Sequence, residues 1–373
     1  MSRRPISLTF FLLFAPILYF SCKAPEKPVT KDEASQLAKK IIHSVQNHNS
    51  VILDNIFDAQ VFARRVASEA RKSLSKDIVN GAMDGLKSAH FGQQIVAAVG
   101  EKGSYELVKQ YEKEGKQHLL FRMYNAGSVN YHDFELVKTE EEVKAADVFI
   151  YLSGENLSKT FGDALLMMQE NLSSSSKSEQ ELVANMKKIK SVMAQRDFQK
   201  AEEVFESFPP EMQRQKMFQL IHVQIGEGLG NDEYSKALTQ YRTLFPNDPN
   251  TYLLSVDAYV LQKKYPEALD AVNKLDSLIN KDPFQDYYRG LMYKLMEDST
   301  HSRECFERLH QNMPAFGNGT IELITIYAND GQVDKAAQLL KQSETDKSIS
   351  EEEGQQLCVL HPDLDKAMKA AGQ

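Results

Sequence analysis

The chain has 373 residues, 52 acidic and 44 basic side chains, and a net charge of −8 at neutral pH. This length leaves room for two domains. The acidic balance, with no long basic run after residue 4, argues against binding to the phosphate backbone of nucleic acid. The cysteines and histidines do not show the spacing that holds a metal ion, so we expect no metal and no other cofactor.

The first 21 residues have the pattern of an export signal. Two arginines at positions 3 and 4 precede an apolar stretch, residues 6–20, that is too short to span a bilayer comfortably. No later run of apolar residues approaches membrane length. We therefore predict that the mature chain is soluble apart from this leader and lies outside the cytoplasm.

The end of this leader carries a second pattern. Ser21, a small residue, directly precedes Cys22, and a polar stretch with prolines follows. The pattern resembles a bacterial lipoprotein signal, with Tyr19 and Phe20 in place of the leucine and the small residue usual in that family. The resemblance implies removal of residues 1–21, acylation of Cys22 and a tether over residues 22–30. It also implies a location in the cell envelope, anchored to the inner or outer membrane, with the body in the periplasm or at the cell surface. The alternatives are an ordinary secretory signal and an uncleaved anchor.

Residues 31–171 are expected to form an α+β domain. Apolar residues recur at helical spacing between residues 31 and 99. From Tyr105 the apolar period changes to two, which predicts strands. Four strands are expected, at residues 105–111, 118–124, 129–137 and 147–152. The short turns between them favour an antiparallel meander packed on the preceding helices.

Helices followed by a curved antiparallel sheet loosely resemble the cone-shaped NTF2-like (nuclear transport factor 2-like) folds, which include both enzymes and binding modules. In an enzyme, His118, His132 and Asp133 would be the candidate acid–base groups. His132 and Asp133 are neighbours along one strand and point to opposite faces, so they cannot act as a dyad. His118 is out of phase with the apolar residues of its strand. We interpret these histidines as exposed or core residues and assign no catalytic residue.

The next segment predicts the domain boundary. Residues 161–171 are expected to form a connecting helix. The stretch from Leu172 to Ser178 contains four consecutive serines and little apolar content, which predicts a hinge or spacer. We place the boundary in a linker over residues 172–181.

Residues 182–345 repeat with a period of about 34. Tyr259, Tyr293 and Tyr327 are 34 residues apart. A small residue followed four positions later by a large apolar one places both on one helix face. The five such pairs are Ala201 with Phe205, Ala237 with Tyr241, Ala268 with Val272, Ser302 with Phe306, and Ala336 with Leu340. Helix pairs of this kind bury their apolar faces by stacking, so we predict an all-α helical-repeat solenoid.

This pattern resembles the tetratricopeptide repeat (TPR) family. In the unit that begins at Pro283, the residues that match the family's spacing are Gly290, Tyr293, Phe306, Leu309 and Pro314. The chain has no tryptophan, so the early tryptophan of the family is absent, and the first two units are irregular. The resemblance implies a concave surface that binds another protein.

The C-terminal residues 346–373 are expected to form either a capping helix or a frayed tail. Leu357, Leu360, Leu364 and Met368 are spaced as one face of such a helix. Cys305 directly precedes an inner-helix residue, which favours a buried thiol. A disulfide between Cys305 and Cys358 is the alternative.

Two functions remain open. The first is a lipid-anchored extracytoplasmic scaffold or adaptor that binds a protein or peptide in the groove of the repeats. Its expected groove residues are Asn250, Gln285, Arg289, Asn318 and Glu322. The second is a membrane-tethered small-ligand-binding protein or enzyme, with a deep apolar pocket and a perturbed His or Asp in the N-terminal domain. We favour the first, a protein that is not an enzyme, because acid–base motifs are absent.

Overall fold

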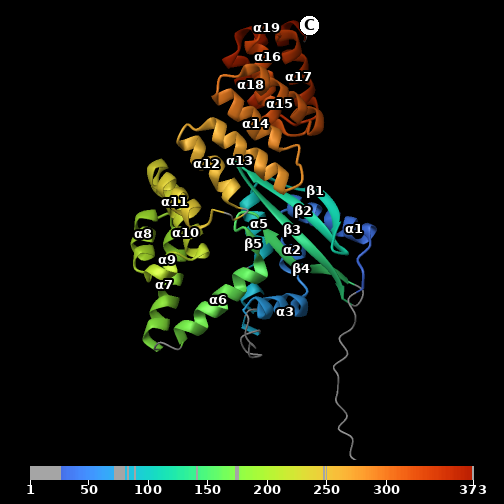
Figure 1. Cartoon of the computed structure of the whole chain (residues 1–373). Helices are drawn as coiled ribbons and strands as arrows, with labels where there is room; N and C mark the ends of the chain where they lie inside the picture. The colour runs from blue at the N-terminus through green and yellow to red at the C-terminus, as the bar shows by residue number, and fades with distance from the viewer. Residues whose placement is uncertain are drawn as a thin grey trace, which may run out of the picture.

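The computed structural model describes residues 27–70, 80–81, 84–87, 90–139, 142–172, 176–246, 248 and 250–371. The expected signal peptide, Cys22 and the first part of the tether, residues 22–26, lie outside the described residues. As predicted, an N-terminal α+β region is followed by an all-helical C-terminal region (Figure 1).

The N-terminal helices begin directly after the tether. They are α1 (Lys31–Gln46), α2 (Val51–Asp54), α3 (Ala59–Glu69) and α5 (Phe91–Val99), and residues 80–81 and 84–87 are also helical. α1 starts at a capping box, in which the Thr30 and Glu33 side chains each accept a hydrogen bond from the other residue's backbone N–H. Helical structure is thus confirmed for most of the described residues between 31 and 99, with breaks at residues 47–50 and 55–58. The same prediction for residues 71–79, 82–83 and 88–89 lies outside the described residues.

Five strands form one antiparallel sheet in the order β1-β2-β3-β4-β5. They are β1 (Ser104–Lys113), β2 (Lys116–Asn125), β3 (Ser128–Thr139), β4 (Glu142–Ile150) and β5 (Glu155–Asn156). The prediction of four strands is wrong in number, because β5 has only two residues, too few to show alternation. β4 also begins five residues before the expected start. The turns before β2 and β3 have positive φ at Glu114, Gly115, Ala126 and Gly127, as two-residue hairpin turns require.

The two faces of the sheet pack against different parts of the chain. Because side chains alternate along a strand, β2 directs Leu119 and Phe121 to one face and Leu120 and Arg122 to the other. The inner face packs on α1, α2, α3 and α5 and forms the main N-terminal core. On the outer face, Leu120 belongs to a cluster that contains residues of the C-terminal helices. The sheet therefore lies between two helical layers.

The C-terminal region is a succession of helices. They are α6 (Leu157–Leu172), α7 (Ser176–Ala194), α8 (Phe198–Glu206), α9 (Pro210–Gln213), α10 (Lys216–Leu229), α11 (Asn231–Leu244), α12 (Thr251–Leu261), α13 (Tyr265–Leu278), α14 (Gln285–Leu295), α15 (Ser299–Asn312), α16 (Gly317–Asn329), α17 (Val333–Thr345), α18 (Glu351–Leu360) and α19 (Pro362–Ala371). Much of the predicted linker is helical, since α6 ends at Leu172 and α7 begins at Ser176. Glu179, Gln180 and Glu181 favour helix and outweigh the serines before them. Residues 173–175 lie outside the described residues.

Consecutive helices pack as pairs, α10 with α11, α12 with α13, α14 with α15 and α16 with α17. The ten small and large residues of the 34-residue pattern are all buried, none more than 3% exposed. Gly290 shows why one position is small: a Cβ there would lie 2.7 Å from the Phe306 ring. In Figure 1, α6–α11 lie to one side of the sheet, α12 and α13 cross above it, and α14–α19 extend beyond.

The chain closes with two helices rather than one or a frayed tail. α18 begins at a capping box formed by Ser350 and Glu353. Leu357 and Leu364 are buried against residues of α16 and α17, so α18 and α19 cover the apolar side of the last pair. Within the described residues, no helix has both the length and the apolar character to cross a membrane.

Candidate functional site

A buried ion pair holds the outer face of the sheet against the C-terminal helices. Arg122, on β2, places Nη1 2.7 and 2.8 Å from the two carboxylate oxygens of Asp282. Their side chains are only 4% and 2% exposed. Asp282 lies in the loop before α14, where Oδ1 also accepts the backbone N–H of Phe284. We call this contact of β2 and β3 with α12–α16 the sheet–helix interface.

Neighbouring groups complete this ion pair. Tyr131, on β3, donates its hydroxyl to Asp282 Oδ2 at 2.9 Å. The Arg122 guanidinium lies over the Phe284 ring, 4.6 Å from its centroid. Burial opposes the charge on Arg122, yet the Asp282 carboxylate raises its pKa above the ordinary value. Arg122 therefore stays cationic, with Asp282 as its buried partner and the more exposed Glu106 as a second partner at Nη2.

Side-chain amides at the starts of three successive first helices bind the N-terminal region. Asn250, directly before α12, donates Nδ2 to the backbone oxygen of Leu152 at 3.0 Å. Gln285, the first residue of α14, donates Nε2 to the Tyr131 hydroxyl at 2.7 Å. Asn318, near the start of α16, donates Nδ2 to a tyrosine hydroxyl of β2 at 2.9 Å. These positions are 35 and 33 residues apart, so the repeat places the same kind of donor against the N-terminal region each time.

These contacts change the interpretation of the expected groove. We predicted that Asn250 and Gln285 face outward toward a partner. The structure places both side chains against the chain's own N-terminal region, with no exposed surface. The repeat pattern correctly predicted which side of the helix pairs makes contacts. It did not predict that the chain's own N-terminal region, rather than a partner, covers that side.

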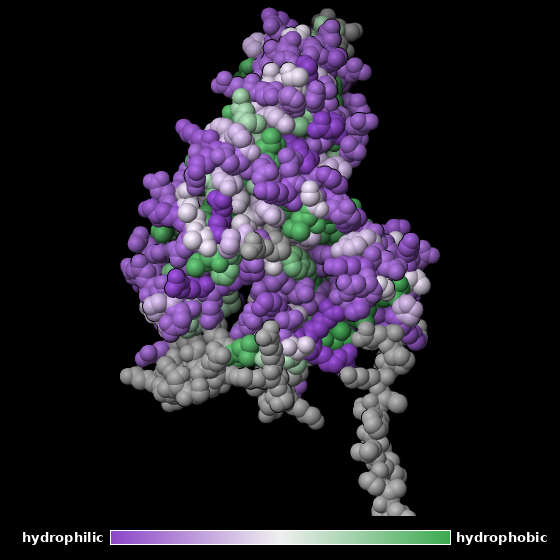
Figure 2. Space-filling view, viewed as in Figure 1, coloured by the Kyte–Doolittle hydropathy of each residue, from purple (hydrophilic) through white to green (hydrophobic). Residues whose placement is uncertain are grey.

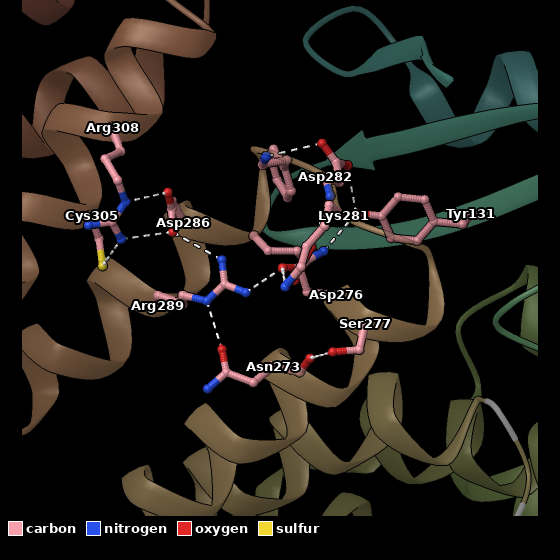
Figure 3. Close-up of polar contacts among 12 residues, drawn as sticks. Tyr131, Asn273, Asp276, Ser277, Lys281, Asp282, Asp286, Arg289, Cys305 and Arg308 are labelled. Atoms are coloured by element: carbon pink, nitrogen blue, oxygen red, sulfur yellow. Dashed lines mark hydrogen bonds and ion pairs between the residues drawn. The ribbon is translucent and has the colours of Figure 1, made fainter. Parts of the chain in front are cut away.

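Arg289 belongs to a row of alternating charges that ties α13, α14 and α15 together (Figure 3). Its Nη2 is 2.6 Å from Asp276 Oδ2, and its Nη1 is 3.0 Å from Asp286 Oδ1. The other oxygen of Asp286 is 3.0 Å from Arg308 Nε. Burial opposes the charge on Arg289, but the hydrogen bonds to these carboxylates raise its pKa. Arg289 is thus engaged within the helical region.

The two remaining groove residues stay accessible. Glu322, on α16, accepts a hydrogen bond from Lys294 Nζ at 2.6 Å and is 22% exposed. Asn318 is exposed despite its bond to the sheet. Asn318 therefore contacts the sheet, whereas Glu322 is bound within the helical region.

A cavity of about 630 Å³ lies next to this interface, between the β2–β3 turn and helices α10–α14. Its apolar wall includes Met123 and Ile150 from the sheet and Leu220, Val223 and Leu254 from the helices. On the face shown in Figure 2, hydrophobic residues gather where the helices meet the sheet, while the rest of the surface is mostly hydrophilic. Chain segments more than 100 residues apart therefore build one apolar hollow.

The polar wall of the cavity is acidic. Glu227 on α10 and Asp257 on α12 line it, and Tyr234 on α11 donates its hydroxyl to Asp257 Oδ2 at 2.9 Å. Asp257 is exposed toward the cavity, and the protein atoms around it displace enough water to raise the pKa of its carboxyl. The Tyr234 hydrogen bond opposes the shift and the charge on Glu227 adds to it. No cation contributes to the shift, and within the described residues no ion pair involves either carboxylate.

His132 is a core histidine with both ring nitrogens occupied. Asn130 accepts two backbone N–H groups at Oδ1, which fixes its amide so that Nδ2 faces His132 Nε2 at 3.1 Å. Nε2 therefore accepts a hydrogen bond from Asn130, and the ring proton is on Nδ1, which donates to the Tyr105 hydroxyl at 3.0 Å. Burial lowers the pKa of His132 to about 4. It does not line the cavity, and a neutral, fully bonded ring has no free site for acid–base work.

His118 and Asp133 form a pair that sequence reasoning missed. Nδ1 of His118 is 3.2 Å from Asp133 Oδ1, and Tyr111 donates its hydroxyl to the other oxygen. The side chains of His118 and Asp133 are each 12% exposed. The β2–β3 register pairs Leu120 with Asp133 and so puts His118 and Asp133 on one face, which the hairpin turn alone could have indicated. As expected, His132 and Asp133 point to opposite faces. The trio of Tyr111, His118 and Asp133 lies outside the cavity wall.

Both described cysteines are free thiols, so Cys305 and Cys358 are not bridged. Cys305 is buried, and burial raises the pKa of its thiol. In the part of the chain that the structure describes, no group of three or more His, Cys, Asp or Glu side chains is arranged to hold a metal ion.

The sequence contains one feature that could have indicated the acidic cavity residue Asp257. Asp257 is the one charged residue in the otherwise apolar or small-polar α12, between Val256 and Ala258, which are both buried. A lone carboxylate on such a helix suggests a special environment. Glu227, on an exposed part of α10, carries no comparable signal.

No family model matches the chain, and no curated protein matches its sequence. What the chain does is therefore inferred from its own residues and their geometry.

Proposed function

We propose that the chain is a lipid-anchored adaptor of the bacterial cell envelope that binds another protein and has no catalytic step of its own. An acylated Cys22 is the proposed anchor, and the body would lie in the periplasm or at the cell surface. The 34-residue period and the burial of its small and large positions support a TPR-like solenoid as the binding framework. The order of helices and strands supports an NTF2-like N-terminal domain, a fold that does not itself assign a function.

The observation that carries this proposal is the cavity at the sheet–helix interface. Helix-pair repeats offer an inner surface that suits another chain. Here the starts of α12, α14 and α16 already bind the N-terminal region, and the neighbouring cavity of about 630 Å³ remains open. Its size, apolar wall and few polar groups are typical of a site for a peptide or a small ligand.

A second candidate function is that of a small-ligand carrier. The same cavity favours it, because it combines an apolar wall with a carboxyl whose pKa is raised. The location differs from our expectation, which placed such a pocket inside the N-terminal domain.

Photo-crosslinking in intact cells tests the adaptor function. Gln224 is exposed and lines the cavity, so a photoreactive amino acid at position 224 should yield a defined protein adduct. The same amino acid at position 359, where Val359 is 80% exposed on α18, serves as the control and should give no such adduct. Leu220→Trp, which fills the cavity, should abolish the adduct at 224. An adduct that survives this substitution contradicts the proposal, and an adduct with a small molecule alone supports the carrier.

The anchor is tested separately. Cys22→Ala should move the chain from the membrane fraction to the soluble periplasmic fraction, and the acyl-dependent mass shift of the mature protein should disappear. Ser21→Ala, which keeps a small residue before the cysteine, is the matched control and should leave both unchanged. Membrane retention of Cys22→Ala would exclude the lipid anchor.

A further inference from the structure

Two carboxylates line the cavity without a counter-charge. Glu227 and Asp257 come from different helices, α10 and α12, and lie near enough for the charge on Glu227 to act on Asp257. Tyr234 occupies only Oδ2 of Asp257, and Oδ1 accepts no hydrogen bond from a described residue. Both residues are exposed at the cavity wall, and like charges that lie close together are stabilised by a cation between them. No described cation lines this cavity; Arg196 lines the adjoining hollow, and no ion pair joins it to Glu227. The wall is therefore suited to a cationic ligand.

Gln285 adds an unoccupied acceptor to the same wall. Its side chain is fully buried and lines the cavity, and its Nε2 donates to Tyr131. Its Oε1 has no hydrogen-bond donor among the described residues. Buried amide oxygens without a partner are uncommon in folded proteins. A ligand with N–H donors would provide one.

A second hollow of about 650 Å³ adjoins the cavity. The two share Gln224 and Glu227, and the second extends to Arg196 and Phe198 at the start of α8. Glu227 thus lies where the hollows meet. A small amine would occupy only the first hollow, whereas an extended chain advances about 3.3 Å per residue and would occupy both.

From these features we propose that the cavity binds an extended segment of the partner protein through a lysine side chain, whose ammonium group is held by Asp257 and Glu227. This inference rests on the proposed adaptor function. A lysine stem packs on an apolar wall such as that formed by Leu220, Val223 and Leu254, while its compact ammonium brings three N–H donors to the carboxylates. The residues next to the lysine would be apolar.

Fluorescence polarisation with the full-length lipidated chain in detergent tests this inference. The probe is a fluorescein-labelled heptapeptide with one central lysine flanked by valine, leucine and alanine. The matched peptide carries norleucine in place of lysine. We expect the lysine peptide to bind at least about tenfold more tightly, because a charge-assisted contact contributes more than 1.4 kcal/mol. n-Butylamine, added at the concentration at which unlabelled peptide competes, should not displace the probe.

Three variants assign the preference to residues. Asp257→Asn and Glu227→Gln keep the size of each side chain, and Asn can still accept the Tyr234 hydrogen bond, so thermal melting should be little changed. Each should reduce the preference for lysine over norleucine at least about threefold, and the double variant should abolish it. Asp363→Asn, at an exposed ion pair on α19, is the control and should leave the preference intact.

The outcomes separate this inference from the proposed function. Equal affinity for the two peptides, or a lysine preference that survives the double variant, overturns the ammonium site. If Leu220→Trp still weakens both peptides in that case, the adaptor function stands. Displacement by n-butylamine as effective as by peptide overturns the extended segment in favour of a small amine. Absence of peptide binding overturns the inference, and absence of the adduct at position 224 overturns the adaptor function as well.

Discussion

The two faces of the sheet are held in different ways. On the inner face, Leu119, Phe121 and Phe134 have no exposed surface and pack on helices that precede the sheet in sequence. On the outer face, Arg122 reaches Asp282, 160 residues later, through a buried ion pair. Apolar packing is non-directional and proportional to the area buried. A buried charge requires an oppositely charged partner at a defined position, because a displaced partner leaves the charge buried and uncompensated. The inner face therefore stabilises the N-terminal region, and the outer face specifies which helices dock on it.

The largest effect is expected from a cavity on the inner face. Phe134→Ala removes a fully buried ring that packs edge to face on Phe121 and Phe91. We expect a loss of about 4 kcal/mol in the free energy of unfolding of the N-terminal region. Urea denaturation followed by circular dichroism measures it. Val51→Ala, where Val51 is 62% exposed, is the control, and a similar loss there would show that burial does not decide the effect.

On the outer face, Asp282→Ala should release the docked helices rather than unfold the sheet. It leaves the Arg122 charge buried without its partner, at a cost of about 3 kcal/mol. Hydrogen exchange should increase at residues 279–288 and in β2, while the strand β4 stays protected. Small-angle scattering should show a larger radius of gyration.

A double variant sharpens this result. Arg122→Leu with Asp282→Leu replaces the ion pair by apolar side chains of similar size, which is often neutral for stability. Docking should then return at least in part, since Leu120 and Ile279 already make the interface apolar nearby. If the single variant leaves exchange in both elements unchanged, the ion pair does not specify docking.

His132 makes the inner face sensitive to acid. Its pKa is about 4 in the folded chain, below the ordinary value of about 6.5 in an unfolded one. Below pH 6.5 His132 binds a proton in the unfolded chain but not in the folded chain. The free energy of unfolding is therefore highest above pH 6.5 and falls as the pH is lowered toward 4. At pH 4.5 the loss should be about 2.5 kcal/mol. Denaturation midpoints measured between pH 7 and 4.5 would show it.

Substitution separates His132 from the other titrating groups. His132→Phe lacks the proton and should flatten the pH dependence between 6.5 and 4.5, whatever its absolute stability. His43→Gln, at an exposed position on α1, should keep the full slope. An unchanged slope in His132→Phe would assign the acid sensitivity to another group.

Much of this architecture could be predicted from residue spacing. The 34-residue period located the buried pairs, including Ser302 and Phe306, because one helix face repeats every unit. The alternation from Tyr105 onward predicted four strands. The two-residue β5 was not predicted, because it is too short to alternate and is defined only by its pairing with the end of β4. The Ser-rich linker is largely helical because its neighbours favour helix.

The site was less predictable than the fold. Periodicity indicates which residues of a helix pair point outward, but it cannot indicate whether a partner or the chain's own sheet covers them. Asn250 and Gln285 are the examples, since both are outward with respect to their helices and buried by the N-terminal region. The cavity residues Glu227 and Asp257 meet the β2–β3 turn only through the tertiary fold. Spacing along the sequence does not indicate which distant segments come together in the folded chain.

The smallest effect is expected from the other carboxylate that contacts Arg122. Glu106, on β1, is paired with Nη2 of the same guanidinium, but its side chain is 49% exposed whereas that of Asp282 is 2% exposed. Water and salt screen the exposed pair, so Glu106→Ala should cost less than about 1 kcal/mol, and the difference should vanish in about 1 M salt. Parallel denaturation of Glu106→Ala and Asp282→Ala at low and high salt measures both. If the two variants are equally costly, the total charge around Arg122 holds the outer face rather than the burial of one pair.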